Sequence, residues 1–284
     1  MSDDPKTLVS TAWLSDHLKD PDLRVLDASW YLPDAGRDPQ AEYHTAHIPG
    51  ARFFDIDEIS DARSDLPHMA PPVEKFMSRM RSMGVGDGHQ IVVYDGAGLL
   101  SAPRVWWLFK LMGHRDVAVL DGGFLKWQAE GHPTEDLAPV VKDRHLTVRY
   151  QNQLVRDVTQ VSQASKLGTT QIVDARAAAR FRGDAPEPRE GLRAGHIPGA
   201  RNVPFNTLLN TDQTMKSPDQ LRAVFEEAGV DLSAPVITSC GSGITAAILG
   251  LALERIGHDR WSLYDGSWAE WGMFPTVPVA TGDA

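Results

Sequence analysis

The sequence predicts an α/β protein made of two copies of one domain, each a central parallel sheet flanked by helices. Three observations carry this prediction. The chain has 284 residues, more than the roughly 100–200 residues of an ordinary domain. Short runs rich in Val and Ile alternate with helical patterns, as in parallel sheets buried on both faces. Several motifs also occur twice, in the same order.

The repeated motifs keep a nearly constant separation, which indicates a tandem duplication. They are His-Ile-Pro-Gly-Ala-Arg at 47–52 and 196–201, Val-Leu-Asp-Ala at 25–28 against Ile-Val-Asp-Ala at 172–175, and Leu-Asp-Gly-Gly at 120–123 against Tyr-Asp-Gly-Ser at 264–267. Residues 6–135 are therefore assigned to an N-terminal domain and residues 151–284 to a C-terminal domain. The segment between them, 136–150, has mixed charge and no clear period, and it is the expected linker.

The expected elements follow the same duplicated order. Apolar runs that end at turn residues predict strands at 24–28, 90–94 and 117–120, and then at 171–175, 235–239 and 261–264. Helical patterns, three of which begin near Pro or Ser, predict helices at 72–83, 102–112, 218–228 and 244–256. The parallel strands are expected to be joined by right-handed crossovers.

Composition excludes several classes of function. Lys and Arg number 28 against 38 Asp and Glu, a net charge of −10, which argues against a general binder of nucleic acid or of anionic membranes. The longest apolar stretch, 244–253, is about half of what a membrane-spanning helix needs. The first residues lack the basic and apolar segments of a signal peptide, so a cytoplasmic protein is expected. Phosphate-loop and dinucleotide-binding fingerprints are missing, and neither a metal nor an organic cofactor is expected.

The chain has one cysteine, Cys240, which cannot form an intrachain disulfide or a thiolate zinc cluster. Such a cysteine is either a small buried apolar residue or a reactive thiol. Aligning the two copies sets Cys240 opposite Asp95, at the carboxyl end of a central strand, where open α/β sheets bind ligands. A structural cysteine would more naturally fall inside the strand, and burial in apolar packing would argue against reactivity.

The loop after this cysteine reads Gly241, Ser242, Gly243, Ile244 and Thr245. Its glycines let successive backbone N–H groups point toward one anion-binding position, and the following helix adds the positive end of its dipole. Both effects favour a thiolate and can hold an anion on or beyond the sulfur. A reactive Cys240 is therefore the preferred interpretation.

With its tandem copies, its two His-Ile-Pro-Gly-Ala motifs and its single cysteine loop, the sequence resembles a two-domain rhodanese-type sulfurtransferase from about Leu8 to Val279. The resemblance implies a catalytic C-terminal copy and an N-terminal copy without the cysteine, in agreement with Asp95. Thiosulfate-using rhodaneses resemble Cys-Arg-Lys-Gly-Val-Thr in this loop, whereas the 3-mercaptopyruvate branch resembles Cys-Gly-Ser-Gly-Val-Thr. This chain departs from the second pattern only at Ile244.

The 3-mercaptopyruvate branch also resembles this chain in two further segments. Arg-Phe-Arg-Gly at 180–183 and Pro-Glu-Pro-Arg at 186–189 imply that Arg180 and Arg189 bind the substrate's carboxylate and keto oxygens, for which a guanidinium fork is suited. In the first copy, Asp57 and His68 fall on residues proposed in that branch to form a proton relay with the loop serine, here Ser242. The active site is then expected in the cleft between the two domains.

These assignments imply sulfur transfer from 3-mercaptopyruvate through a Cys240 persulfide, with release of pyruvate. The acceptor is a thiol, cyanide or a thioredoxin-like protein, and the enzyme is expected to be a monomer. Two alternatives stay open: a thiosulfate:cyanide sulfurtransferase on the same scaffold, and a noncatalytic persulfide carrier or regulatory binding domain. A cysteine phosphatase is disfavoured, because its loop needs an Arg where this chain has Ala246.

Overall fold

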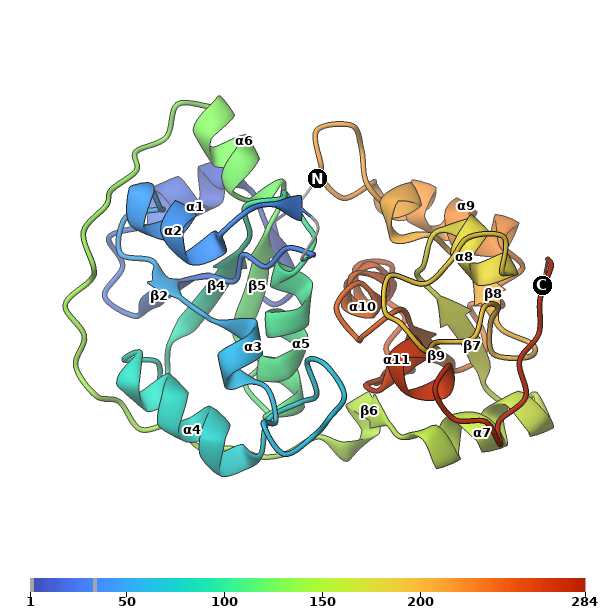
Figure 1. The fold of residues 1–284 in the computed structure, drawn as a ribbon. Coiled ribbons are helices and arrows are strands. Elements are labelled where there is room, and N and C mark those ends of the chain that lie inside the picture. Colours follow the sequence, from blue (N-terminus) through green and yellow to red (C-terminus); the bar gives the residue numbers. More distant parts are fainter. Residues whose placement is uncertain (1–2, 33–34, 284) are drawn as a thin grey trace. The chain divides into compact units, whose positions relative to one another are not determined.

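A computed structural model describes residues 3–32 and 35–283 and divides the chain into two compact units. Unit 1 contains residues 1–62, 70–151 and 210–215, and unit 2 contains residues 63–69, 152–209 and 216–284. Each unit has one five-stranded sheet in which all pairings are parallel. The predicted duplication is therefore present in the fold (Figure 1).

In unit 1 the strand order is β1-β5-β4-β2-β3, with helices between the strands. The elements are β1 (Leu8–Val9), α1 (Thr11–His17), β2 (Leu23–Asp27), α2 (Pro39–Thr45), β3 (Arg52–Phe53), α3 (Ile56–Ile59), α4 (Val73–Ser82), β4 (Gln90–Tyr94), α5 (Ala102–Leu111), β5 (Val117–Leu120) and α6 (Gly123–Ala129).

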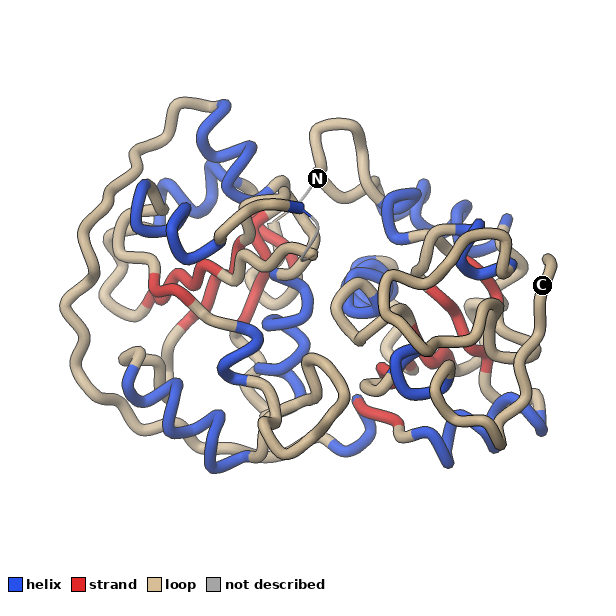
Figure 2. Tube along the Cα trace, in the orientation of Figure 1, coloured by secondary structure: helices blue, strands red, loops and turns tan. Residues whose placement is uncertain are grey.

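In unit 2 the order is β6-β10-β9-β7-β8, in which each strand takes the place of its counterpart in unit 1. Figure 2 shows the strands and helices of both units. The elements are the short 3-10 helix η2 (Asn152–Leu154), β6 (Val155–Arg156), α7 (Val158–Leu167), β7 (Gln171–Asp174), α8 (Ala178–Arg182), β8 (Arg201–Asn202), the 3-10 helix η3 (Phe205–Leu208), α9 (Pro218–Glu227), β9 (Val236–Ser239), α10 (Ala246–Arg255), β10 (Trp261–Tyr264) and α11 (Ser267–Trp271).

The six strands and four helices expected from the sequence are all present, with ends that differ by at most two residues. The edge strands β1, β3, β6 and β8 were not predicted, because each has only two residues and carries no period of its own. Helix α10 begins at Ala246 and not at Ile244, because the two residues before it still belong to the cysteine loop.

The pairing register places the loops that begin at Asp95 and Cys240 at the equivalent edge of each sheet. In unit 1 Asp27 pairs with Tyr94 at the ends of β2 and β4, and in unit 2 Asp174 pairs with Ser239 at the ends of β7 and β9. The residues that follow, Asp95 and Cys240, therefore begin equivalent loops. Helices α5 and α10 leave these loops and pack on their own sheets.

The cores are apolar and dominated by aromatic rings. Trp106, Trp107 and Trp268 are fully buried, as expected for core residues. His47 and His196 of the repeated hexapeptide are also buried. Each donates its Nδ1–H to a backbone carbonyl oxygen, of Tyr43 and Phe181 respectively, and stacks on the aromatic ring of that same residue. These histidines are structural in both units.

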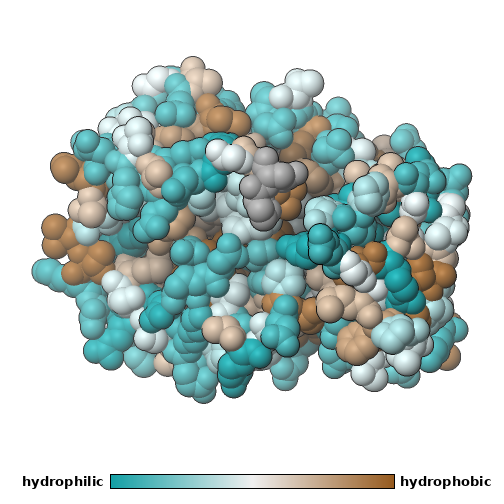
Figure 3. Space-filling view, in the orientation of Figure 1, coloured by the Kyte–Doolittle hydropathy of each residue, from teal (hydrophilic) through white to brown (hydrophobic). Residues whose placement is uncertain are grey.

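Residues 136–150 contain no helix or strand and run along unit 1. Backbone hydrogen bonds join Asp87 to His145 and Met112 to Arg149. The visible face is mostly hydrophilic, with hydrophobic residues in small groups (Figure 3). Within residues 3–32 and 35–283, the helices are all too short or too polar to cross a bilayer.

Candidate active site

Cys240 lies directly after β9, the middle strand of the unit 2 sheet, as the sequence predicts. Its exposed fraction is 1%, so the thiol is buried. The contacts of the residue are nevertheless polar. The N–H of Gly243 donates to the Cys240 Sγ across 3.1 Å, and the Ser267 hydroxyl accepts from the Cys240 N–H across 3.2 Å. The sulfur is therefore held at a hydrogen-bonding loop and not within apolar packing alone.

Backbone N–H groups of helix α11 bind the carbonyl oxygens of the cysteine loop. The N–H groups of Trp268 and Ala269 donate to the carbonyls of Cys240 and Gly241 at 2.9 and 2.8 Å. Ser267, fully buried, has a φ of +49° and donates its hydroxyl to Tyr264 O. These bonds fix the carbonyl side of the loop, whose Gly243 N–H is directed at the sulfur.

Gly243 adopts a φ of +81°, a conformation that glycine reaches without the steric cost borne by other residues. This conformation aims its N–H at the sulfur three residues earlier. Ser242 and Ile244, on either side of it, are buried. Thr245 is the N-cap residue of α10, and its side chain makes no capping hydrogen bond. The five predicted loop residues are thus contiguous around Cys240.

The equivalent loop of unit 1 shows what this backbone can bind. The carboxylate of Asp95, the residue aligned with Cys240, accepts from the N–H of Ala97 at 2.9 Å through Oδ1. Its Oδ2 accepts from the N–H groups of Leu100, Ser101 and Ala102 at 2.8–2.9 Å. In unit 1 the loop and the start of α5 therefore enclose an anionic side chain. In the N-terminal copy the Asp95 side chain therefore occupies the position in which such a loop can bind an anion.

Arg180, the first predicted substrate ligand, lies on α8 and reaches the cysteine loop. Its Nη2 stands 3.3 Å from the point where a Cβ would be on Gly241. The same guanidinium donates to Glu187 through Nη2 at 2.5 Å and through Nε at 3.3 Å. In the part of the chain that the structure describes, Nη1 has no hydrogen-bond partner, and the side chain is 24% exposed.

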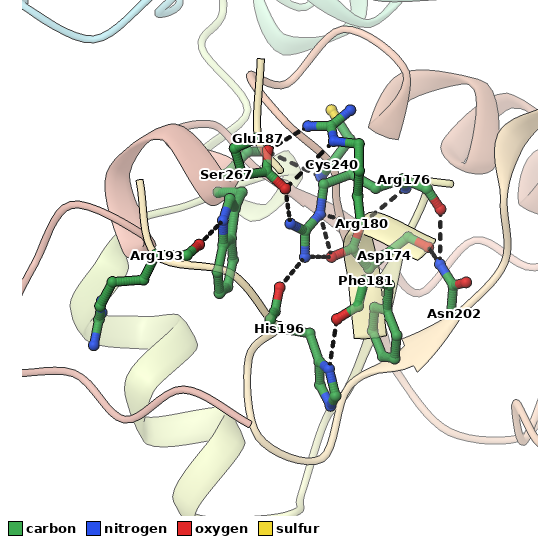
Figure 4. A network of polar contacts seen from close by, with 12 residues as sticks. Asp174, Arg176, Arg180, Phe181, Glu187, Arg193, His196, Asn202, Cys240 and Ser267 are labelled. Atoms are coloured by element: carbon green, nitrogen blue, oxygen red, sulfur yellow. Dashed lines mark hydrogen bonds and ion pairs between the residues drawn. The ribbon is translucent and has the colours of Figure 1, made fainter. Parts of the chain in front are cut away.

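A buried chain of ion pairs holds Arg180 in place (Figure 4). Arg176 donates to Glu187 through Nη1 at 2.8 Å and to Asp174 through Nε and Nη2 at 2.7–3.1 Å. Its guanidinium also stacks over Trp268 at 4.2 Å. Burial opposes the charged form of Arg176, but Asp174 and Glu187 outweigh burial and raise its pKa.

Sequence reasoning missed Asp174, Arg176, Glu187 and Ser267 as parts of the site. The repeated Asp-Ala motif contained Asp174, and the Pro-Glu-Pro-Arg motif contained Glu187. For Asp174, Arg176 and Glu187 the signal that could have found them is charge, because three ionisable groups among apolar residues require partners; nothing in the sequence singles out Ser267. Arg182, by contrast, pairs with exposed Asp184 at the surface.

The other predicted residues are placed as follows. Arg189 lies in the loop between α8 and β8, which also carries Glu187, and it is partly exposed. His68 is buried, has a φ of +61° and belongs to unit 2, as Ser242 does. Asp57 belongs to α3 of unit 1, where its Oδ2 accepts from the Trp30 indole at 3.1 Å. The relay of Asp57, His68 and Ser242 and the binding role of Arg189 stay predictions.

The equivalent sheet edge of unit 1 gives its aspartate a different partner. Asp27 is aligned with Asp174, but Ser29 stands where unit 2 has Arg176. The Asp27 Oδ1 accepts from the N–H and hydroxyl of Ser29. Burial without a cationic partner raises the pKa of Asp27 to about 6. Among residues 3–32 and 35–283, no cluster of three or more His, Cys, Asp and Glu side chains is arranged to hold a metal ion.

Comparison with known proteins agrees with this geometry. The Rhodanese-like domain family matches residues 10–130 and 157–273. The chain is 43% identical to 3-mercaptopyruvate sulfurtransferase of Escherichia coli strain K12 over 95% of this chain and 96% of that protein. It is 42% identical to thiosulfate sulfurtransferase of Cricetulus griseus over 97% of this chain and 94% of that protein.

The fold comparison agrees with the sequence comparison. The crystal structure of SseA from Escherichia coli, a 3-mercaptopyruvate sulfotransferase with the rhodanese fold, matches with a TM-score of 0.85 and 41% identity. That match covers 92% of this chain and 98% of SseA. The chain therefore belongs to the rhodanese-like family, and it is a sulfurtransferase.

Proposed function

We propose that this enzyme takes sulfur from 3-mercaptopyruvate, carries it as a persulfide on Cys240 and delivers it to a thiol or to cyanide. The observation that carries the proposal is the hydrogen bond from the Gly243 N–H to the Cys240 Sγ, in a loop whose copy in unit 1 encloses a carboxylate. A loop that binds an anion stabilises both the attacking thiolate and the persulfide anion.

In the first step the Cys240 thiolate attacks the sulfur of the donor, and a sulfur–sulfur bond forms. The carbon–sulfur bond breaks, and its electron pair passes to carbon as the enolate of pyruvate. A proton on that carbon completes pyruvate, and the Ser242 hydroxyl is the proposed source. In the second step the acceptor attacks the outer sulfur, and the Cys240 thiolate returns.

Three features favour a small donor with one carboxylate. The loop side chains between Cys240 and Ala246 carry no charge, so charge recognition falls to Arg180 and Arg189. Arg180 turns Nη1 away from Glu187, which leaves a donor edge for a carboxylate or keto oxygen. The low exposure of Cys240 suits a compact donor better than a large one.

Internal symmetry supports a place for His68 at this loop. Gln213 has a φ of +63° and packs on Gly98 in unit 1, where a Cβ added to Gly98 would stand 2.4 Å from Gln213 Cβ. His68 has a φ of +61° and belongs to unit 2. His68 and Gln213 are separated by the same number of residues as Gly98 and Gly243, or Asp95 and Cys240. By this register His68 would pack on Gly243, beside the Ser242 hydroxyl whose proton it is proposed to relay.

The rival donor is thiosulfate, and the 42% identity to a thiosulfate sulfurtransferase supports testing it. Specificity constants for thiosulfate and 3-mercaptopyruvate should be measured side by side. The proposal expects a clear preference for 3-mercaptopyruvate, with one pyruvate released per sulfur transferred. A preference for thiosulfate would contradict the donor assignment.

A noncatalytic carrier is separated by the same assay. It would accept persulfide sulfur from another protein but release no pyruvate from 3-mercaptopyruvate. The Cys240→Ser variant is the control, because its hydroxyl can accept the Gly243 hydrogen bond but is a poor nucleophile. It should unfold at the wild-type temperature and release no pyruvate.

A further inference from the structure

A carboxylate stands next to the predicted donor-binding arginine, and its charge bears on which anions the site accepts. Glu187 is 2% exposed at its side chain and contacts two guanidiniums, those of Arg176 and Arg180. A lone carboxylate at this depth would be strongly disfavoured. Its position is therefore stabilised by the arginines, and it in turn determines where the Arg180 fork points.

The bonding pattern divides the Arg180 guanidinium into two edges. Glu187 accepts from Nε and Nη2, so one edge is already occupied before any donor binds. Nη2 also lies over Gly241, which directs the remaining edge toward the cysteine loop. Arg180 thus offers one oriented pair of donors, and its orientation depends on Glu187.

The charges of this network cancel. Asp174 and Glu187 carry two negative charges, and Arg176 and Arg180 carry two positive charges, with the ion pairs at 2.5–2.8 Å. The loop from Gly241 to Thr245 adds no side-chain charge. Arg180 therefore presents directed hydrogen bonds near Cys240 with little net positive charge behind them.

We infer that Glu187 is a positioning and specificity-determining residue, which orients Arg180 and tunes the donor site to monoanions over dianions. The inference rests on the function proposed above and goes beyond it, because it assigns the choice of donor charge to a residue that would not itself touch the donor. A dianion would gain from a second positive charge near Arg180, and Glu187 removes that gain.

The decisive variant is Glu187→Gln, which keeps the shape of the side chain and removes its charge. Arg176 retains its two-point pairing with Asp174, and Arg180, which loses its charged partner, has a side chain that is 24% exposed to solvent. The ratio of the specificity constant for thiosulfate to that for 3-mercaptopyruvate should rise about tenfold, within the range that one unit charge supplies at several Å in a partly screened site. The KM for 3-mercaptopyruvate should rise more than kcat falls.

Two further variants separate charge from structure. Glu187→Asp keeps the charge and should return the ratio to near the wild-type value. Asp184→Asn removes one negative charge from an exposed pair with Arg182 on the same loop, and it should leave the ratio unchanged. An unchanged ratio in Glu187→Gln, or an equal rise in Asp184→Asn, would overturn the inference.

A measurement on the wild-type enzyme decides the matter if Glu187→Gln does not fold. Pyruvate and sulfate are compared for their protection of Cys240 against alkylation by neutral iodoacetamide. Pyruvate should protect at a concentration at least about tenfold lower than sulfate, because one charge suits the site better than two. Equal protection, or better protection by sulfate, would overturn the inference.

These outcomes are distinct from failure of the proposed function. If the wild-type enzyme released no pyruvate from 3-mercaptopyruvate, the proposed function would fail before Glu187 was altered. If the wild-type enzyme released pyruvate and the ratio did not move in Glu187→Gln, the proposed function would stand and only the role of Glu187 would fall.

Discussion

The backbone N–H of Gly243 donates a hydrogen bond to the Sγ of Cys240 across 3.1 Å. The sulfur accepts this bond from within its own loop, three residues along the chain, at the mouth of the central strand β9. In the proposed mechanism this donor stabilises negative charge that develops on the sulfur. The bond depends on the φ of +81° at Gly243, which ties the chemistry to one backbone conformation.

Gly243→Ala should impair catalysis more than stability. A methyl group at a positive φ costs about 1–2 kcal/mol, and relief of that strain would turn the N–H away from the sulfur. We expect kcat/KM to fall at least about tenfold. Gly257→Ala is the matched control, because Gly257 has a φ of +78° with open space where its Cβ would lie. It should lose similar stability in thermal unfolding and keep full activity, and equal activity of the two variants would contradict this account.

Asp95→Ala should destabilise the protein and spare its chemistry. The variant deprives four backbone N–H groups in the loop and at the start of α5 of their shared acceptor. Leaving buried donors unsatisfied costs about 1–3 kcal/mol for each group, with incomplete additivity. We expect a loss of about 2–4 kcal/mol in the free energy of unfolding by urea, and wild-type kcat at a temperature where the variant is folded. Unchanged stability would show that the carboxylate does not organise the loop.

Arg189→Ala should raise the KM for 3-mercaptopyruvate with a smaller effect on kcat. A guanidinium that binds donor and transition state equally contributes to KM alone. Steady-state kinetics on the purified variant provide the test. If both constants match the wild type, Arg189 is a solvated loop residue and the donor contacts Arg180 without it.

Asp27 should make stability depend on pH in the opposite sense to a salt-bridged carboxylate. Its folded pKa of about 6 lies above the ordinary value of 3.8, so the folded state holds the proton more tightly. The resulting stabilisation is complete below the unfolded pKa and is lost as pH rises through 6. The shift corresponds to roughly 3 kcal/mol, as an order of magnitude.

Asp27→Asn removes this dependence while keeping an oxygen to accept from Ser29. The free energy of unfolding should be measured at pH 5 and pH 8 for the wild type and the variant. The variant should gain stability relative to the wild type on going to pH 8. A difference that is the same at both pH values would show that Asp27 does not titrate in this range.

Much of the fold followed from the sequence, for identifiable reasons. Strands such as Val117–Leu120 are buried at every residue, so the apolar run is uninterrupted and ends at turn residues. The identical hexapeptides then aligned the two copies, so each strand expected in one copy had a counterpart in the other. Edge strands such as β3 and β8 are defined by pairing with a neighbour, and pairing leaves no local pattern to read.

The candidate site was only partly predictable. Cys240 stood out because a single cysteine opened a glycine-rich loop, and the loop residues followed from it. Asp174 and Glu187 pair with arginines between two and eleven residues away, but the sequence does not show that β7, α8 and the loop after α8 bury these charges together. The roles of Ser267 and Asp95 also depend on the folded structure. Ser267 accepts a hydrogen bond from the Cys240 N–H, and the Asp95 carboxylate accepts from N–H groups of the equivalent loop in unit 1. Spacing along the chain cannot show either contact.

The central claim concerns one covalent state of Cys240, and mass spectrometry tests it directly. The enzyme is incubated with 3-mercaptopyruvate in the absence of an acceptor, digested without reductant, and the peptide that contains Cys240 is weighed. We expect a gain of one sulfur atom on that peptide, lost again when cyanide is added. Pyruvate release with no sulfur on Cys240, before or after cyanide, would contradict it.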